Sequence, residues 1–344
     1  MKKLPIIAVV ILLFAGSFLI LNCEGPEGPQ GPPGPKGESG QDLESPTPSG
    51  RVFSLVITNN GHDHNGNPTL YLTFDKNAKG DQDTIVSNLV TYPPEIDGED
   101  GGTAEWGPES STISLTNLEG PDNGIYTALV RSAYDRDYVY FLVKWDEVDN
   151  ADFDAAESRE KRLWTYDGSA WSSSGDEDRV FFMWEIKSIK DWDKYGCIVA
   201  CHEPEMRTNS AEEVGDIWHW KASRTDPAGY LDDKHIVWNG GSGNGRKGDQ
   251  GTSSYIDNKL ENGWPRYMHK DGVVAAVYPF WYYDAADMDS TLAWGPGSTV
   301  AGEIIKLPTG SRADVLAKGK YSDGTWTLEI KRLRNTGNGD DAQF

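Results

Sequence analysis

Cysteine is scarce in this sequence: 344 residues hold only three, at positions 23, 197 and 201. A structural zinc site uses four ligands, often from two close cysteine pairs, and Cys197 and Cys201 form the only close pair. Zinc is therefore disfavoured. The sequence also lacks a nucleotide-binding loop and a nucleophilic triad, so nothing in it predicts catalysis, and we expect the chain not to be an enzyme.

Positive charge is low as well. Lys and Arg total 32 against 54 Asp and Glu, which gives a net charge of −22. Nucleic-acid binding depends on Lys and Arg contacts to phosphates, so a nucleic acid partner is excluded. Strong acidity suits the surface of an exported protein, although it does not specify a function.

Long hydrophobic runs are missing from the body of the chain, but one stands at its start. Two lysines precede an almost unbroken apolar stretch over residues 4–21, which is typical of a secretory signal. Residues 20–23, Ile-Leu-Asn-Cys, resemble a bacterial lipobox, although Asn22 replaces the usual Gly, Ala or Ser. We predict a signal peptide over 1–22 and lipidation of Cys23, with an uncleaved anchor helix as the alternative. Both place the chain on a membrane of a bacterial cell envelope, at the periplasmic or outer surface.

Residues 23–50 are predicted to be an anchor and linker. Glycine occupies every third position from Gly25 to Gly40, often beside proline, and this is the collagen pattern. Because the run is short, we interpret it as a stiff spacer on the order of 50 Å long at about 3.1 Å per residue. Oligomerisation through this segment is the alternative. Residues 51–344 are predicted to fold as one domain.

The chemistry of the chain is concentrated in Cys197-Ile-Val-Ala-Cys201-His202. The usual signature for c-type haem attachment is Cys-x-x-Cys-His, and here the spacer has three residues. The motif predicts one covalent haem c, with thioether bonds from both cysteines and His202 on the iron. A Cys197–Cys201 disulfide is the alternative, which an oxidising compartment permits.

The periodicity is mainly that of strands. Alternating apolar runs separated by Gly, Asp and Asn turns predict an antiparallel β-sandwich. A long haem-carrying insertion is predicted over residues 187–279, with short helices around the cysteines and over 210–214. The expected strands cover 52–57, 69–74, 126–134, 138–145, 180–186, 313–321 and 326–332, the last two joined by a turn at Ser322–Thr325.

Several segments resemble one family. The most specific is Trp218-His219-Trp220-Lys221 within residues 214–233, and others lie at 134–146, 176–180, 265–268, 310–315 and 323–333. They are similar to the ethylbenzene dehydrogenase gamma-subunit-like haem-binding domain family, from about Thr127 onward. The resemblance implies a haem-binding β-sandwich, and its c-type members include the three-residue spacer.

The end of the sequence departs from the family pattern. Family members usually continue past residues 337–341 with a further hydrophobic strand, whereas this sequence stops at Phe344. A missing strand leaves an unpaired sheet edge, which favours association of copies. We expect either that another element fills this edge or that the sequence is truncated.

A second iron ligand must approach the haem face opposite His202. We predict Met268, because it lies in the segment resembling the family and because methionine ligation is implied by the enzyme-associated members, which use methionine with lysine. Met268 with His202 predicts a relatively high potential. The alternatives are His219, His269 and Met206; a helix would place Met206 on the same side as His202.

Four further residues are expected near the haem. Trp218 and Trp220 are predicted to wall the haem pocket, which raises the potential by keeping it dry, or else to be core residues. Lys221 and Arg224 are predicted to pair with the propionates, or else to be solvated surface charges. The acidic stretch 146–154 offers oxygen ligands for calcium, but its spacing is not that of an EF-hand.

Together these features predict an envelope-anchored monohaem c-type cytochrome that passes single electrons between redox protein partners. One alternative is a β-sandwich module that binds glycan or protein and carries a Cys197–Cys201 disulfide. Another is a haem subunit docked to a molybdenum oxidoreductase, as the resemblance implies.

Overall fold

The computed structural model divides the chain into two units, residues 1–50 and 51–344. The signal peptide, Cys23 and the collagen-like linker lie outside the described residues, so these predictions remain untested. No helix in the described part of the chain is long and apolar enough to cross a membrane. The structure describes residues 54–58, 72–74, 85, 87–107, 111–117, 125–146, 162–175, 177–192, 196–202, 205–272 and 279–344.

The larger of two main sheets has seven strands. β3 (Ser87–Leu89) pairs in parallel with β5, and the other neighbours are antiparallel. The remaining strands, in order across the sheet, are β2 (Leu72–Phe74), β4 (Ser111–Asn117), β5 (Ile125–Tyr134), β6 (Tyr138–Asp146), β24 (Thr325–Leu333) and β23 (Val315–Ser322).

The predicted hairpin between the last two strands is confirmed. Ser322 and Thr325 are paired at the turn, and between them Asp323 and Gly324 have φ angles of 50° and 86°. A two-residue hairpin turn requires such left-handed conformations, and Asp-Gly provides them at low cost. β23 lies at the edge of this sheet. On the side of β23 away from β24, the N–H of Ala317 donates to Gly229 O at 3.0 Å, so this edge is hydrogen-bonded at that point.

The second main sheet has five antiparallel strands. It corrects the predicted insertion, because three of these strands fall inside residues 187–279 and the connection that carries the cysteines spans only 188–213. The strands were missed because Asp216, His219 and Lys221 interrupt the apolar alternation of the third one. In order, they are β1 (Ser54–Thr58), β9 (Arg179–Lys187), β12 (Val214–Lys221), β13 (Asp232–Val237) and β14 (Arg246–Gly248).

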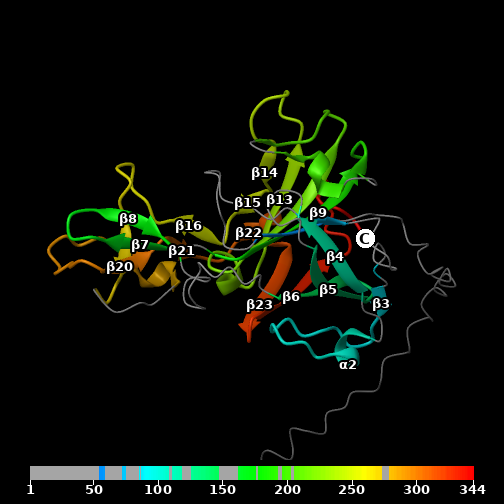
Figure 1. Ribbon diagram of the computed structural model, residues 1–344, viewed down its shortest axis with the longest axis horizontal. Helices are drawn as coiled ribbons and strands as arrows, with labels where there is room; N and C mark the ends of the chain where they lie inside the picture. The colour runs from blue at the N-terminus through cyan, green and yellow to red at the C-terminus, as the bar shows by residue number, and fades with distance from the viewer. Residues whose placement is uncertain are drawn as a thin grey trace, which may run out of the picture. The chain divides into compact units, whose positions relative to one another are not determined.

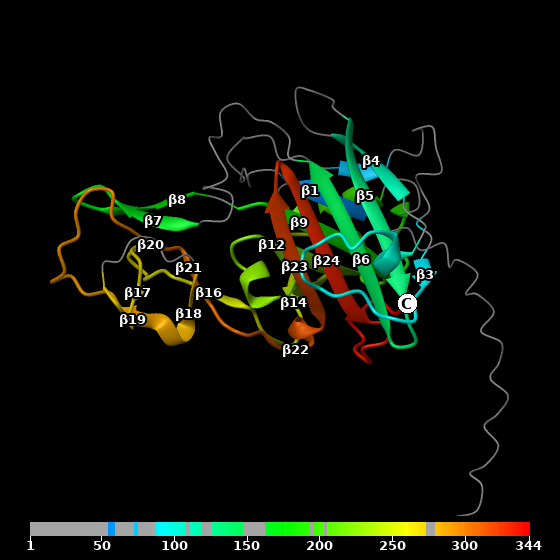
Figure 2. The same cartoon turned by 90° about the horizontal axis from the view of Figure 1, so that it is seen from below.

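The two sheets enclose the main core, so the predicted β-sandwich is confirmed (Figure 1; Figure 2). Trp145 of β6 stacks on Trp326 of β24 with ring centroids 6.1 Å apart, and Trp220 of β12 meets Trp326 edge-on at 4.8 Å. Aromatic side chains bury large apolar areas in such geometries. β6 reads as an unbroken apolar run because its other face is covered too: Tyr140 packs with Trp106 of α2 (Thr103–Trp106).

The described part of the connection between β9 and β12 contains the 3₁₀ turn η1 (Gly196–Val199). The two-residue strands β10 (Cys201–His202) and β11 (Glu205–Met206) follow it. Residues 209–212 form bends and turns. The predicted helix over 210–214 is therefore wrong. Around the cysteines, the described residues form the 3₁₀ turn η1 and the short strand β10, and residues 193–195 lie outside the described part of the chain.

Smaller sheets and turns complete the second unit, and most of the small sheets gather at the left of Figure 2. They contain β7 (Leu163–Tyr166), β8 (Trp171–Ser174), β15 (Gly251–Thr252), β16 (Tyr255–Asp257), β17 (Tyr267–His269), β18 (Phe280–Trp281), β19 (Ala285–Asp287), β20 (Thr299–Ala301), β21 (Glu303–Ile305) and β22 (Thr309–Gly310). The turns are η2 (Asp226–Ala228), η3 (Tyr282–Asp284) and η4 (Ser311–Ala313).

Candidate functional site

The cysteine motif lies in a tight hairpin. Cys201 pairs with Met206, and His202 pairs with Glu205. Arg207 N–H donates to Ala200 O at 3.0 Å and extends the pairing. Met206 therefore lies across from Cys201, which corrects the helical placement used in the sequence analysis. The side chains of Cys201 and His202 lie outside what the structure describes.

Cys197 is buried against the side of the five-stranded sheet that faces away from the seven-stranded sheet; we call this side the outer face and the opposite side the inner face. Cys197 and Ala200 are both buried in a hydrophobic cluster, and Met206 packs against this cluster. Ile189 and Trp192, from the segment between β9 and β12, cover it. Its floor consists of Phe181 and Met183 of β9, Ile217 of β12 and Ile236 of β13.

β12 presents alternate residues to the two faces, because successive side chains of a strand point in opposite directions. Ile217, His219 and Lys221 lie on the outer face, whereas Trp218 and Trp220 belong to the core between the sheets. The expectation that the two tryptophans wall the haem pocket is corrected: both are fully buried core residues.

His219, on the outer face, has a ring nitrogen that could bind a metal. Its ring packs edge-on against Phe181 at 5.7 Å, and its Nδ1 is enclosed without a hydrogen-bond partner among the described residues. Burial lowers the pKa of His219 well below its usual value, and the positive charges of Lys221, Lys234 and Arg246 lower it further. The imidazole is therefore neutral, which is the form that binds a metal.

Lys221 is buried in an ion-pair network. Its Nζ lies 2.6 Å from Asp232 Oδ2 and 3.1 Å from the hydroxyl of Tyr255. Burial lowers the pKa of Lys221 to about 8 despite this partner. Lys234 Nζ lies 2.9 Å from the same carboxylate, and Arg312 also bonds it. The alternative that Lys221 is a solvated surface charge is wrong.

Arg224 and Arg246 add charge around His219. Arg224 pairs with Glu177, whose Oε2 also accepts the backbone N–H of Ser223 at 2.9 Å. Arg246 Nη1 lies 3.7 Å from Met206 Sδ, and it forms no ion pair with any residue that the structure describes. In a chain of net charge −22, the outer face around His219 is locally positive and suits an anionic group.

The sequence pattern of the ethylbenzene dehydrogenase family matches residues 111–344, which is more than half of the chain. This chain belongs to the ethylbenzene dehydrogenase family. The match spans the cysteine motif and every strand of the two main sheets except β1, β2 and β3, and the predicted family is confirmed. No curated protein matches the chain.

Within this family member, two predicted ligands lie away from the cysteine motif. Met268 on β17 is buried with Trp164, Trp171 and Val300 in a separate hydrophobic cluster. The ring of His269 packs against Phe280. Only Met206 and His219, of the four candidate second ligands, share the outer face with Cys197.

Sequence reasoning missed Lys234 and Arg246. Both lie on strands inside the predicted insertion over residues 187–279, which was expected to hold only short helices. Lys234 of β13 lies opposite Ile217, and Arg246 of β14 lies opposite Ile236. No local motif marks them, because their position beside His219 depends on strand register. A prediction of β13 and β14 would have been needed to find them.

Proposed function

We propose that this member of the ethylbenzene dehydrogenase family is an envelope-anchored monohaem c-type cytochrome that transfers single electrons between redox protein partners. The observation that carries the proposal is the packing of Cys197 on the sheet face that also holds His219. The Nδ1 of His219 is enclosed and has no hydrogen-bond partner among the described residues. A haem bound there supplies a one-electron couple. In this proposal the chain itself performs no substrate chemistry.

The residues have distinct roles in this proposal. Cys197 and Cys201 would hold the haem through two thioether bonds, and His202 would be one ligand of its iron. We propose His219 as the second ligand in place of Met268, because His219 shares the outer face with Cys197 and its imidazole is neutral. Met206 is the remaining candidate on this face.

The cations of the outer face support the same proposal. Haem propionates are anionic, and charge-assisted bonds to Arg or Lys are among the strongest hydrogen bonds in proteins. Arg246 is the best placed to pair with a propionate, because no ion pair to a described residue occupies it. Lys221 and Arg224 are held by Asp232 and Glu177, so they contribute positive potential rather than direct pairing.

Membership of a dehydrogenase family supports redox proteins as partners. It also supports a second arrangement, in which the domain is the haem subunit of a larger oxidoreductase. The predicted lipid anchor at Cys23 favours the free-standing form.

The test is a spectrum of the full-length protein produced with the cytochrome c maturation machinery. We expect a Soret band that stays with the polypeptide after acid-acetone extraction and is lost in the Cys197→Ala/Cys201→Ala variant. We expect His219→Ala to convert the oxidised iron from low spin to high spin, whereas the matched variants Met268→Ala and His269→Ala keep the wild-type spectrum. A colourless wild-type protein overturns the haem assignment, and a spin change in Met268→Ala overturns the choice of His219.

A further inference from the structure

Three aspartates meet on the inner face of the five-stranded sheet. Asp216 comes from β12, Asp233 from β13 and Asp341 from the C-terminal loop. Each is at most 2% exposed, and one carboxylate oxygen of each lies within 4.8 Å of the other two. We call these three residues the acid cluster.

The acid cluster carries more negative charge than its described neighbours compensate. Arg332 of β24 is fully buried, and its guanidinium nitrogens lie 3.4 Å from Asp216 Oδ2 and 3.0 Å from Asp341 Oδ2. Asp233 has no ion pair with any residue that the structure describes. Three carboxylates and one guanidinium leave a net charge of −2 when all are ionised.

Some carboxylate oxygens of the acid cluster accept hydrogen bonds, and others have no partner among the described residues. Asp216 Oδ2 accepts the N–H of Ala342 at 2.9 Å, and Asp341 Oδ2 accepts the hydroxyl of Thr336 at 2.5 Å. Four oxygens are enclosed without a hydrogen-bond partner in the described chain: Asp216 Oδ1, Asp341 Oδ1 and both oxygens of Asp233. Buried carboxylates in proteins are paired, protonated or bound to a metal.

Asp233 is the decisive residue. Its side chain is completely buried, neither oxygen has a partner among the described residues, and it is directed at the other two aspartates. An acid in this position is costly unless a cation joins it.

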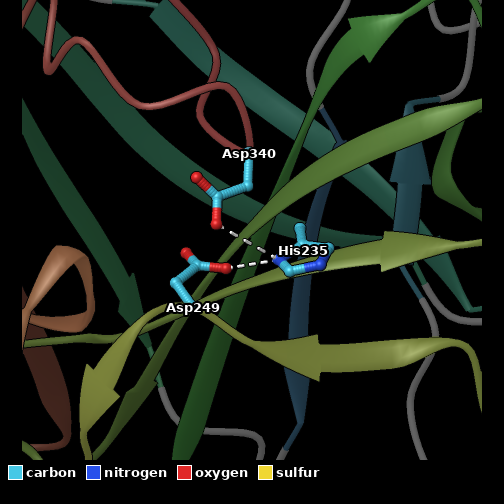
Figure 3. Close-up of side chains that lie close together, drawn as sticks. All are labelled: His235, Asp249 and Asp340. Atoms are coloured by element: carbon cyan, nitrogen blue, oxygen red, sulfur yellow. Dashed lines mark hydrogen bonds and ion pairs between the residues drawn. The ribbon is translucent and has the colours of Figure 1, made fainter.

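Asp249 lies near the acid cluster but, unlike Asp233, it has a basic partner, His235. His235 lies on the same face of β13, and its Nδ1 is 2.5 Å from Asp249 Oδ1 and 3.8 Å from Asp340 Oδ2 (Figure 3). The imidazole therefore already bonds Asp249, and Asp340 lies nearby. Asp249 Oδ2 is enclosed and unpartnered within the described part of the chain, so it adds a fifth oxygen next to the acid cluster.

We propose that the acid cluster binds one calcium ion. The donors are all oxygen, which a hard divalent cation prefers, and a charge of +2 balances the net charge of −2. Magnesium usually keeps several of its waters in a strict octahedral geometry, whereas calcium accepts about six to eight oxygen ligands, carboxylates and waters among them, in flexible geometry. A buried cluster built from carboxylates fits calcium better. The ion ties the C-terminal loop to β12 and β13, independently of any haem.

The test uses the full-length protein after removal of bound ions with EDTA. We expect calorimetry to detect one calcium per chain and saturating calcium to raise the unfolding temperature by several degrees, because a ligand that binds only the folded state stabilises it. Asp233→Asn is expected to abolish both effects. Asp340→Asn is the matched control: it alters the next residue of the same loop, which is 31% exposed, and should keep both.

Asp233→Asn also keeps the test independent of folding. Because it removes an uncompensated buried charge, the variant should be at least as stable as the wild type in EDTA and should gain nothing from calcium. The proposal is overturned if stripped wild-type protein takes up no calcium, or if Asp233→Asn binds it as the wild type does. Equal stabilisation by magnesium at the same concentration overturns the choice of calcium.

Discussion

The two faces of β12 bury ionisable side chains of opposite sign. On the outer face, the single carboxylate of Asp232 is shared by Lys221, Lys234 and Arg312. On the inner face, the acid cluster shares the single guanidinium of Arg332. The outer face therefore has an excess of positive charge and the inner face has an excess of negative charge. The two faces are opposite sides of the same strand.

This difference teaches that local charge, and not the net charge of −22, decides what each face can bind. The alternation of a β-strand allows His219 and Asp216, three residues apart, to face opposite environments. An excess of buried charge is unfavourable unless a partner of opposite sign is present. The outer face suits an anion such as a haem propionate, and the inner face suits a cation.

The largest expected effect comes from removing the cation of the inner face. Arg332→Met leaves three buried carboxylates without a counter-charge, so we expect the free energy of unfolding to fall by about 3–5 kcal/mol. The variant also loses the contact of the guanidinium with the ring of Trp218, 5.1 Å away. Urea unfolding in EDTA measures the change.

Two controls make this test specific to charge. Arg136→Met removes a guanidinium that is 94% exposed, and its effect should lie within about 0.5 kcal/mol. Adding Asp216→Asn to Arg332→Met should recover part of the lost stability, since one uncompensated carboxylate is removed. A double variant that is less stable than Arg332→Met alone would contradict the explanation.

A smaller effect is expected on the outer face. Lys221→Met removes the ammonium 2.6 Å from Asp232, but the carboxylate keeps Lys234 at 2.9 Å and the Nε of Arg312 at 3.1 Å. We expect a loss of about 1–2 kcal/mol, measured by urea unfolding beside Arg332→Met. Equal losses in the two variants would break the comparison, because they would show that the number of remaining counter-charges does not matter.

Much of the fold was predictable because it depends on local patterns. The hairpin at Asp323-Gly324 and the pair β5 and β6 follow from alternation and turn chemistry, and they were predicted correctly. β12 and β13 were missed as strands because the polar residues Asp216 and Asp233 sit at inward positions. Asp216 and Asp233 break the alternation of apolar and polar residues, because they are charged residues buried on the inner face.

The candidate site was less predictable than the fold. The motif at Cys197 is readable from spacing alone, and the family resemblance singles out residues 214–233, although not as strands. The orientation of Trp218 and His219 was not readable, because it depends on which face of β12 meets the other sheet. The acid cluster was also hidden, since Asp341 and Asp216 are 125 residues apart in sequence and meet only through packing.

The last expected effect appears only as the pH rises, and it concerns a buried acid that stands alone. Glu329 lies on the side of β24 that faces away from the sandwich core; it is fully buried, and its Oε2 accepts the N–H groups of Asp97 and Gly98 at 2.9 and 2.8 Å. No cation contacts it among the described residues. Burial raises the pKa of Glu329 to about 7. A single acid can thus be neutralised by one proton, whereas the acid cluster needs more.

Because the folded-state pKa of Glu329 is higher than the unfolded value of 4.5, its contribution to stability is full below about pH 4.5 and is lost as the pH rises through about 7. Glu329→Gln keeps an oxygen acceptor and cannot ionise. We expect the variant to match the wild type near pH 5 and to be more stable at pH 8 by up to about 2 kcal/mol, allowing for solvent screening. Glu99→Gln, at an acid that is 61% exposed, should follow the wild type at both pH values in urea unfolding. If Glu329→Gln does the same, a proton does not neutralise the lone acid, and the distinction between it and the acid cluster fails.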